Sequence, residues 1–197
     1  MPDVSKQPQT PSQTVGPFFD FGLFTRKDLN VLVSDGTKGQ RIALRGQVLD
    51  GGGAPVPDAV IEIWQADTNG FFNHPADPNA ANADKYFRGF GRADTVDMGK
   101  FSFKTVKPGT VRFDDTCYQA PHINLRVFAR GMLIHAYTRV YFPDEADANA
   151  NDPILNLVPP ERRHTLIAVR QEEGHDLPTY CFNVVLQGEN ETVFFDP

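Results

Sequence analysis

Hydrophobic and polar residues alternate along much of this chain, beginning at residue 41. In residues 41–48 the apolar side chains of Ile42, Leu44 and Val48 are separated by polar or small residues, and Asp50 and the glycines after it end the run. Because side chains alternate between the two faces of a β-strand, such runs between clusters of Gly, Pro, Asn and Asp predict antiparallel strands. Similar runs occupy residues 60–64, 100–106, 122–130, 132–142, 164–170 and 179–187. Their spacing predicts an all-β protein, built as an antiparallel β-sandwich with long loops.

Helical patterns are few and short. Residues 144–151 place Asp and Glu where the first turn of a helix favours them, which predicts one short exposed helix. Residues 159–163 begin with two prolines and predict the start of another helical turn. The longest connection, residues 67–98, carries Phe and Tyr among Asn, Asp and Gly. A long loop with aromatic residues more often serves a binding site or an interface than hangs free.

The first forty residues have no regular pattern and predict an extended arm. Proline and glycine interrupt the segment, whereas residues 18–24 are rich in Phe and Leu. An exposed arm this apolar is unfavourable in water, so we expect it to pack on its own domain, on a partner chain, or on both. The sequence therefore divides into an arm at residues 1–40 and one β-sandwich domain at residues 41–197.

Composition limits the possible classes of function. A length of 197 residues, with 40% hydrophobic and 22% charged residues, fits one globular domain. The net charge of −6 argues against nucleic acid, whose binding uses a basic surface. Neither a signal peptide nor an apolar run of about 20 residues is visible, which favours a cytoplasmic protein without a membrane segment. Cys117 and Cys181 are too few for a disulfide framework, and two free thiols are expected.

One predicted strand, residues 122–130, has two clearly different sides. Its odd-numbered positions from Ile123 to Ala129 are all apolar, which predicts that they face the core. The opposite side is mostly polar and needs partners for its charges. It consists of His122, Asn124, Arg126, Phe128 and Arg130.

Five segments of the chain match one known sequence pattern, in the correct order and over nearly the whole length. They are residues 10–18, 63–70 (Ile-Trp-Gln-Ala-Asp with a later Gly), 105–109 (Thr-Val-Lys-Pro-Gly), 120–131 and 187–196. The chain resembles the intradiol ring-cleaving dioxygenases, and within them the alpha chains that carry no iron. Each motif alone is weak, and the five together are specific.

The resemblance implies a division of labour between two related chains. In the catalytic beta chains of this family, two tyrosinates and two histidines hold ferric iron, because phenolate oxygens stabilise Fe(III) and imidazoles suit iron well. The alpha chain packs against the beta chain and closes the active-site pocket, in a symmetric alpha/beta hetero-oligomer. The implied holoenzyme cleaves protocatechuate with O2 to 3-carboxy-cis,cis-muconate, a step of aromatic catabolism in the beta-ketoadipate pathway.

The iron ligands of the family are mostly absent from the matching positions. The two tyrosines are replaced by Phe72 and Val111, and the His-x-His pair reads His122, Ile123, Asn124. Phe and Val have no lone pair to donate, and a carboxamide is a weak ligand for ferric iron. We therefore expect this chain to bind no metal and to contribute no catalytic residue of its own, with Fe(III) held by the beta partner.

The resemblance also assigns residues that face the substrate bound to the partner chain. Arg130 matches an alpha-chain arginine, and a planar guanidinium suits a benzoate carboxylate. From composition alone, a surface ion pair is the commoner role for such an arginine. Thr14, Gly16, Pro17 and Phe18 match the arm that lines the pocket. Phe18 stands where the alpha chains have Tyr, so one hydroxyl group is lost and the substrate range is left open.

Two other functions remain as alternatives. A free-standing iron enzyme would need substitute ligands, for which Tyr86 and Tyr118 are the candidates. A stand-alone β-sandwich module could instead bind a small molecule without catalysis. A new metal site of His122 with His74 is a minor possibility. The remaining histidines are expected to be ordinary polar residues, with His135 and His164 in strands and His175 in a solvated turn.

Overall fold

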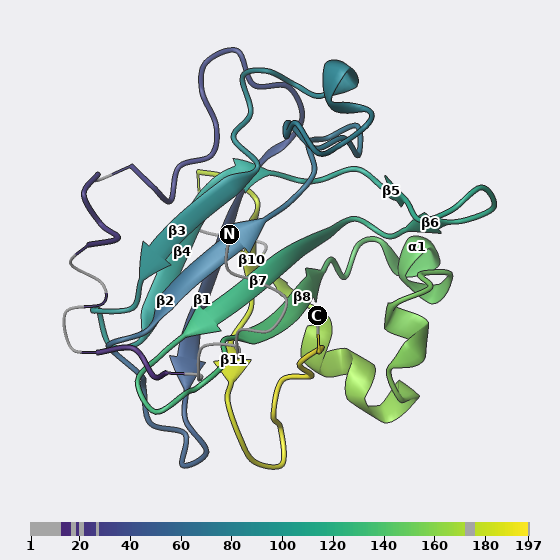
Figure 1. Cartoon of the computed structure of the whole chain (residues 1–197). Helices are drawn as coiled ribbons and strands as arrows, with labels where there is room; N and C mark the ends of the chain where they lie inside the picture. Colours follow the sequence, from purple (N-terminus) through teal and green to yellow (C-terminus); the bar gives the residue numbers. More distant parts are fainter. Residues whose placement is uncertain (1–12, 17–18, 20–21, 27, 172–175, 197) are drawn as a thin grey trace, which may run out of the picture.

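Two β-sheets form the body of the protein. The computed structural model describes residues 13–16, 19, 22–26, 28–171 and 176–196 (Figure 1). The first sheet has the order β11-β1-β10-β9, with β4 also paired to β1, and the second has the order β3-β2-β7-β8. Their bounds are β1 Arg41–Leu49, β2 Val60–Trp64, β3 Phe90–Asp94, β4 Lys100–Val106, β7 His122–Phe128, β8 Ala136–Tyr141, β9 Val169–Gln171, β10 Thr179–Cys181 and β11 Val184–Val185.

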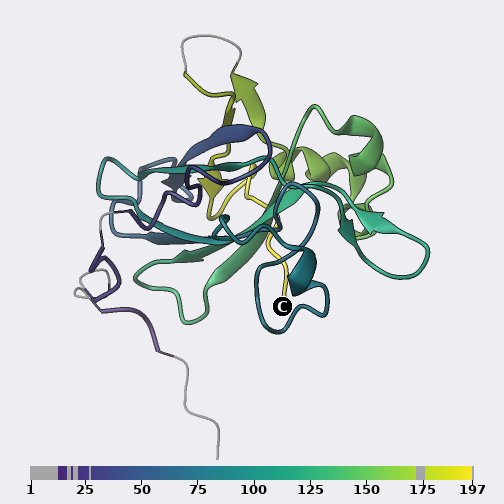
Figure 2. The same cartoon turned by 90° about the horizontal axis from the view of Figure 1, so that it is seen from above.

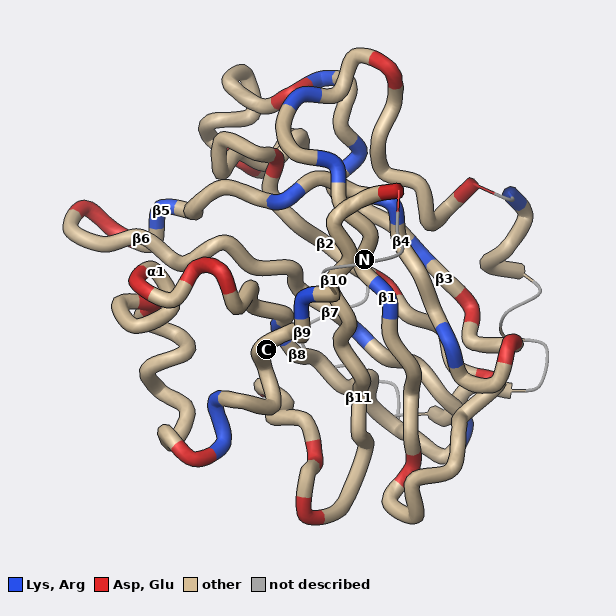
Figure 3. The backbone as a smooth tube through the Cα atoms, turned by 180° about the vertical axis from the view of Figure 1, so that it is seen from behind, with Lys and Arg blue, Asp and Glu red and all other residues tan. Residues whose placement is uncertain are grey.

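Most strand pairs are antiparallel, as the alternating sequence predicts. The second sheet is antiparallel throughout, and in the first sheet only β1 pairs in parallel, with β10 and β11. A separate hairpin of β5 (Val111–Arg112) and β6 (Tyr118–Gln119) projects from the body, with acidic residues at its tip (Figure 3). The predicted all-β sandwich with few short helices is confirmed.

The core lies between the two sheets and follows the predicted strand faces. Ile42, Leu44 and Val48 of β1 are fully buried, as are Ile123, Leu125 and Val127 of β7. Ala129 is also buried, so the side of residues 122–130 that was predicted to face the core does so. Burial of each such side chain stabilises the fold by roughly 1.5–3 kcal/mol.

Four predicted elements differ from the observed ones. The connection at residues 67–98 contains β3, and the run at 164–170 begins in a 3₁₀ helix, η4 (Pro160–Leu166), and reaches a strand, β9, only at Val169. The strand expected at 132–142 begins only at Ala136, so neither His135 nor His164 lies in a strand. The run at 179–187 is divided into β10 and β11. The predicted helix at 144–151 and the helical turn from 159 are confirmed by α1 (Ala146–Ala150) and η4.

A short helical layer covers one end of the second sheet. It consists of α1, η3 (Leu155–Leu157) and η4, and it lies on the side of the molecule away from the described part of the arm (Figure 2). Asp152 is fully buried and organises this layer. Its carboxylate accepts hydrogen bonds from the backbone of Ala120 at 2.7 Å and Leu155 at 2.6 Å, and from the Tyr141 hydroxyl at 3.1 Å. A short 3₁₀ turn, η2 (Ala80–Asn82), lies in the long connection.

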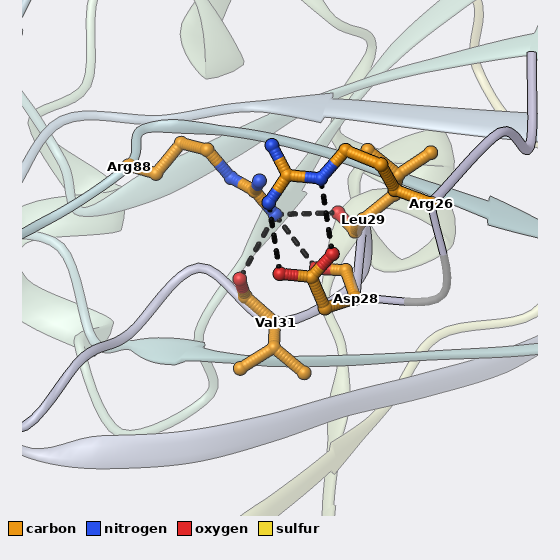
Figure 4. A network of polar contacts seen from close by, with 5 residues as sticks. All are labelled: Arg26, Asp28, Leu29, Val31 and Arg88. Carbon is orange, nitrogen blue, oxygen red and sulfur yellow. Dashed lines mark hydrogen bonds and ion pairs between the residues drawn. The ribbon is translucent and has the colours of Figure 1, made fainter.

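The second half of the predicted arm packs on its own domain. The Leu32 side chain is buried, and the Leu32 backbone bonds Lys104 and Arg88. The Arg88 guanidinium donates to the carbonyl groups of Asp28, Leu29 and Val31 at 2.8–3.1 Å (Figure 4). Packing of the arm on a partner chain stays a prediction.

Two further observations concern general properties of the chain. No helix in the described parts of the chain is long and apolar enough to cross a membrane. Cys117 and Cys181 are both free thiols, as expected.

Candidate functional site

The positions that match the family's iron ligands lie on the outer face of the second sheet and on the loops beside it. Trp64, the last residue of β2, connects two of them. Its indole ring stacks on the ring of Phe72, with centroids 5.8 Å apart and planes 9° apart. Across the sheet, Trp64 pairs directly with Asn124 of β7. Phe72 and Asn124 are therefore neighbours of the same tryptophan, although they are far apart in the sequence.

A close contact between two loops brings Val111 to the same end of the sheet. Gly70 has a φ of +84°, and a Cβ atom there would lie 1.9 Å from the carbonyl oxygen of Thr110. Only glycine permits this approach. The buried carboxylate of Asp67 holds the turn before Gly70 by accepting the backbone N–H groups of Asn69 and Phe71. The motifs that carry the family resemblance thus fix the backbone around the degenerate site.

His122 is buried and held as a neutral imidazole. Its Nδ1 lies 2.8 Å from the carbonyl oxygen of Ala120, to which it donates in the neutral form. Burial, with a contribution from the Arg139 guanidinium, lowers the pKa of His122 to about 4. Its ring packs against Tyr141, with centroids 5.9 Å apart, under the helical layer. The sequence predicted a hydrogen-bonded histidine or a site shared with His74, and His74 instead contacts Trp64.

Asn124 is occupied by a hydrogen bond, and an arginine lies beside it. The Tyr137 hydroxyl donates to Asn124 Oδ1 at 2.6 Å. Arg139 of β8 pairs with Asn124 in the sheet register, and its Nη1 donates to Gln119 Oε1 at 2.7 Å. Burial alone would lower the pKa of Arg139, but the Tyr137 and Tyr141 side chains raise it above its ordinary value, so the guanidinium stays charged.

These residues do not fit a ferric ion. Phe72 and Val111 offer no lone pair, the best donor atom of Asn124 is already bonded to Tyr137, and Arg139 places a positive charge beside His122. In the described residues no three His, Cys, Asp or Glu side chains are grouped closely enough to hold a metal. The two tyrosines considered as substitutes, Tyr86 and Tyr118, are both more than half exposed, at 51% and 58%.

The second group of predicted residues lies at the other end of β7. Arg130 follows this strand in a turn, and its Nε bonds Asp58 Oδ2 at 2.8 Å while its side chain stays 78% exposed. The next residue, Gly131, donates its backbone N–H to Thr14 Oγ1 at 2.8 Å. Thr14 of the arm and Arg130 are therefore brought together, as neighbours of one turn. Gly16 is exposed beside them, and Pro17 and Phe18 lie outside the described residues.

An apolar hollow adjoins this turn. Its volume is about 510 Å³, and it is lined by residues of the arm and of the β7–β8 connection. Phe19 of the arm contacts Phe128, with ring centroids 5.9 Å apart. Leu133 and Ile134 are 62% and 69% exposed, which is unusual for neighbouring large apolar side chains. Such a patch is typical of a surface that another protein covers.

Comparison with known proteins agrees with these features. The sequence profile of the Dioxygenase family matches residues 15–188. The chain belongs to the intradiol dioxygenase family. The chain is 46% identical over 200 residues to the protocatechuate 3,4-dioxygenase alpha chain of Pseudomonas putida, and the match covers 96% of each chain. It is 34% identical over 185 residues to the protocatechuate 3,4-dioxygenase beta chain of Burkholderia cepacia, covering 86% of this chain and 78% of that one.

Solved structures show the same fold. The dioxygenase domain of a carbohydrate-binding fusion protein from Streptomyces sp. SirexAA-E superposes with a TM-score of 0.61, at 23% identity, over 91% of this chain and all of that domain. Catechol 1,2-dioxygenase from Acinetobacter sp. ADP1 gives a TM-score of 0.61 over 85% of this chain and 60% of that one, at 20% identity. At these identities the likeness establishes the fold alone.

The sequence did not reveal three residues that shape the degenerate site. Tyr137 bonds Asn124 directly, and Arg139, which pairs with Asn124 in the sheet register, bonds Gln119. One signal was available, because Tyr137 and Arg139 alternate with Thr138 and Val140 and so share the outer face of their strand. That these two residues meet Asn124 depends on the register of β8 on β7, which no local pattern reveals.

Proposed function

We propose that this chain is the iron-free alpha subunit of a protocatechuate 3,4-dioxygenase, which completes the substrate pocket of a homologous, iron-binding beta subunit. The enzyme formed by the two chains opens the ring of protocatechuate with O2 between its hydroxylated carbons. The observation that carries the proposal is the occupation of the degenerate ligand positions by groups unsuited to iron, in a chain 46% identical to alpha chains.

Arg130 would bind the carboxylate of protocatechuate at the shared pocket. Its side chain is 78% exposed, and its only recorded ion pair among the described residues is with Asp58. Exposed ion pairs contribute only about 0–1 kcal/mol, so a substrate carboxylate can replace Asp58 at little cost. A guanidinium can donate two parallel hydrogen bonds to a carboxylate and so orient the ring as well as bind it.

The arm would line the pocket beside Arg130. Thr14 is tied to Gly131, which fixes the arm next to the arginine. The exposed Leu133 and Ile134 and the adjoining hollow would be covered by the beta subunit, since interface cores are richer in apolar and aromatic residues than the remaining surface. Gly16, Pro17 and Phe18 complete the proposed lining.

This proposal predicts an assembly, and the alternative of a stand-alone binding module predicts a monomer. The test is co-expression of this chain with a beta-type chain, followed by size-exclusion chromatography and measurement of protocatechuate-dependent O2 uptake. We expect a stable hetero-oligomer that consumes O2, and no uptake by this chain alone. A monomer that ignores every beta-type chain would favour the binding module, and O2 uptake by the chain alone would favour a free-standing enzyme.

A further inference from the structure

A cleft of about 560 Å³ opens on the outer face of the second sheet. Its volume lies within the range of small-molecule sites, roughly 300–1,000 Å³. Trp64 and Phe90 provide aromatic surface, and the polar groups come from Glu62, His74, Asn124, Arg126 and Tyr137. The exposed area of the cleft is mainly apolar, with a few convergent polar side chains, which is the composition of a typical ligand site.

The sheet register fixes the positions of these side chains. Trp64 pairs with Phe90 on one side and with Asn124 on the other. One step along the strands, Glu62 pairs with Arg92 on one side and with Arg126 on the other. The cleft is therefore built on paired β-strands. Trp64 and Phe90 form an aromatic row, and Glu62, Arg92 and Arg126 form a charged row beside it.

The charged row leaves one positive charge without a carboxylate partner. Arg92 forms an ion pair with Glu62, and both side chains are mostly buried. Arg126, on the other side of Glu62, is exposed and lies over the ring of Tyr137, 5.9 Å from its centroid. Within the described residues Arg126 has no ion pair and no hydrogen bond. The row of two arginines and one glutamate thus has a net charge of +1 and a guanidinium free to bind an anion.

Two neutral hydrogen-bond donors adjoin this guanidinium. Because Asn124 Oδ1 accepts the Tyr137 hydroxyl, the amide nitrogen of Asn124 is left to donate. His74 Nδ1 accepts the backbone N–H of Ala76 at 3.1 Å, so its proton resides on Nε2 in the neutral form. The His74 ring stands edge-on to Trp64, with centroids 5.7 Å apart, at the cleft. Because the Glu62 carboxylate at the edge of the cleft is paired with Arg92, the groups left for a ligand are mainly donors and a cation.

We propose that this cleft binds a small planar aromatic carboxylate, without catalysis. The carboxylate would bond the Arg126 guanidinium, with Asn124 and His74 as further donors, and the ring would lie against Trp64 and Phe90. Aromatic contacts favour a flat ring over a saturated one, and a charge-assisted bond favours an anion over a neutral amide. The inference concerns this chain alone and does not depend on pairing with a beta subunit.

The chain contains its own reporter for this site. Trp64 is the one tryptophan in the sequence, so its fluorescence responds directly to a ligand in the cleft. The purified chain is titrated with benzoate, with benzamide as the neutral analogue and cyclohexanecarboxylate as the non-aromatic one, and calorimetry checks each titration. We expect a saturable change with benzoate, and binding at least about tenfold weaker for each analogue.

Two substitutions separate the cleft from a general affinity for anions. Arg126→Gln should weaken benzoate binding about tenfold or more, whereas Arg41→Gln, which removes an exposed arginine of the other sheet, should leave it unchanged. Because Arg126 is exposed and forms no hydrogen bond or ion pair with the described residues, its loss should not unfold the chain, which circular dichroism verifies. The proposal is overturned by an absent or unsaturable Trp64 response, by equal binding of benzoate and benzamide, or by loss of binding in Arg130→Gln but not in Arg126→Gln.

Discussion

The hydroxyl group of Tyr137 donates a 2.6 Å hydrogen bond to Asn124 Oδ1, at the position that the sequence resemblance assigns to the second iron-binding histidine. The loss of the ligand is therefore accompanied by a structural replacement. A carboxamide and a phenol now satisfy each other across two adjacent strands, and the half-buried Arg139 supplies a positive charge beside them. The degenerate site is a polar network that needs no metal.

This network predicts a measurable contribution of Tyr137 to stability. Tyr137→Phe should lower the free energy of unfolding by about 1 kcal/mol, because it removes one partly buried hydrogen bond and leaves Asn124 without its partner. Urea unfolding followed by circular dichroism measures the change. Tyr118→Phe is the matched control, since Tyr118 is 58% exposed, and it should change stability by less than about 0.5 kcal/mol. Equal effects of the two substitutions would show that the Asn124 bond has no structural importance.

The buried imidazole of His122 makes stability depend on pH in a defined window. Its folded pKa of about 4 lies below the ordinary value of 6.5, so the unfolded chain binds the proton more readily. The free energy of unfolding should therefore fall as the pH drops from about 6.5 to about 4, by on the order of 3 kcal/mol from this group. His122→Gln should remove that part of the slope, even if its stability at pH 7 is lower. The exposed His164→Gln should keep the slope, and an unchanged slope in His122→Gln would contradict the assignment.

Lys107 links the turn before β5 to the helical layer. Its Nζ bonds Asp144 at 2.8 Å and Glu145 at 2.5 Å. Although burial raises the pKa of Asp144, hydrogen bonds from Lys107 and Tyr180 hold it below its ordinary value. The stabilisation is thus present above pH about 4 and lost as the pH falls through the lower folded pKa. Burial likewise lowers the pKa of Lys107, but the two carboxylates raise it above its usual value, so its contribution persists until strongly alkaline pH.

Lys107→Met should therefore destabilise the chain by about 1–2 kcal/mol at pH 7, and by much less at an acidic pH below the lowered pKa of Asp144. Thermal or urea unfolding at the two pH values measures the difference. Lys100→Met, at an exposed pair with Asp97 of 3.8 Å, should have little effect at either pH. A Lys107→Met cost that does not change with pH would mean that lost packing, and not the ion pairs, is responsible.

The sequence predicted strands well where their inward positions are large and apolar. In β7 every second side chain is a buried hydrophobic residue, and in β1 Ile42, Leu44 and Val48 are, so the pattern was readable. In β3 the inward positions are Gly91 and Ala93, and the space above Gly91 is filled by Leu32, whose Cδ1 would lie 2.5 Å from a Cβ there. Part of that strand's packing is supplied by a distant segment, which no local pattern can show.

The same reason explains the error at residues 164–170. Leu166 is fully buried, but against Tyr141 and Leu155 in the helical layer instead of within a sheet. For the site, motif spacing pointed to Phe72, Val111, His122 and Asn124 as the former ligand positions, and this assignment stays a prediction. It could not show what surrounds them, because Tyr137 and Arg139 reach Asn124 only through the pairing of separate strands.

Arg130 should determine recognition of the substrate carboxylate in the assembled enzyme. Arg130→Gln in the hetero-oligomer is expected to lower kcat/KM for protocatechuate by about 10- to 100-fold, from the loss of a charge-assisted pair of hydrogen bonds. Turnover of plain catechol, which has no carboxylate, should change far less. O2 uptake with both substrates measures the ratio, and Arg112→Gln, on the β5–β6 hairpin, is a control at another exposed arginine. Equal losses for the two substrates would contradict a role in carboxylate recognition.

The iron content of the separated chains tests the central claim most directly. This chain is purified alone and in complex with a beta-type partner, and iron is quantified per chain together with the visible absorption of tyrosinate bound to ferric iron. We predict a colourless chain without iron when it is alone, and a coloured complex whose iron stays with the beta subunit when the chains are separated. Stoichiometric iron bound by the isolated chain, with its own side chains as ligands, would contradict the account.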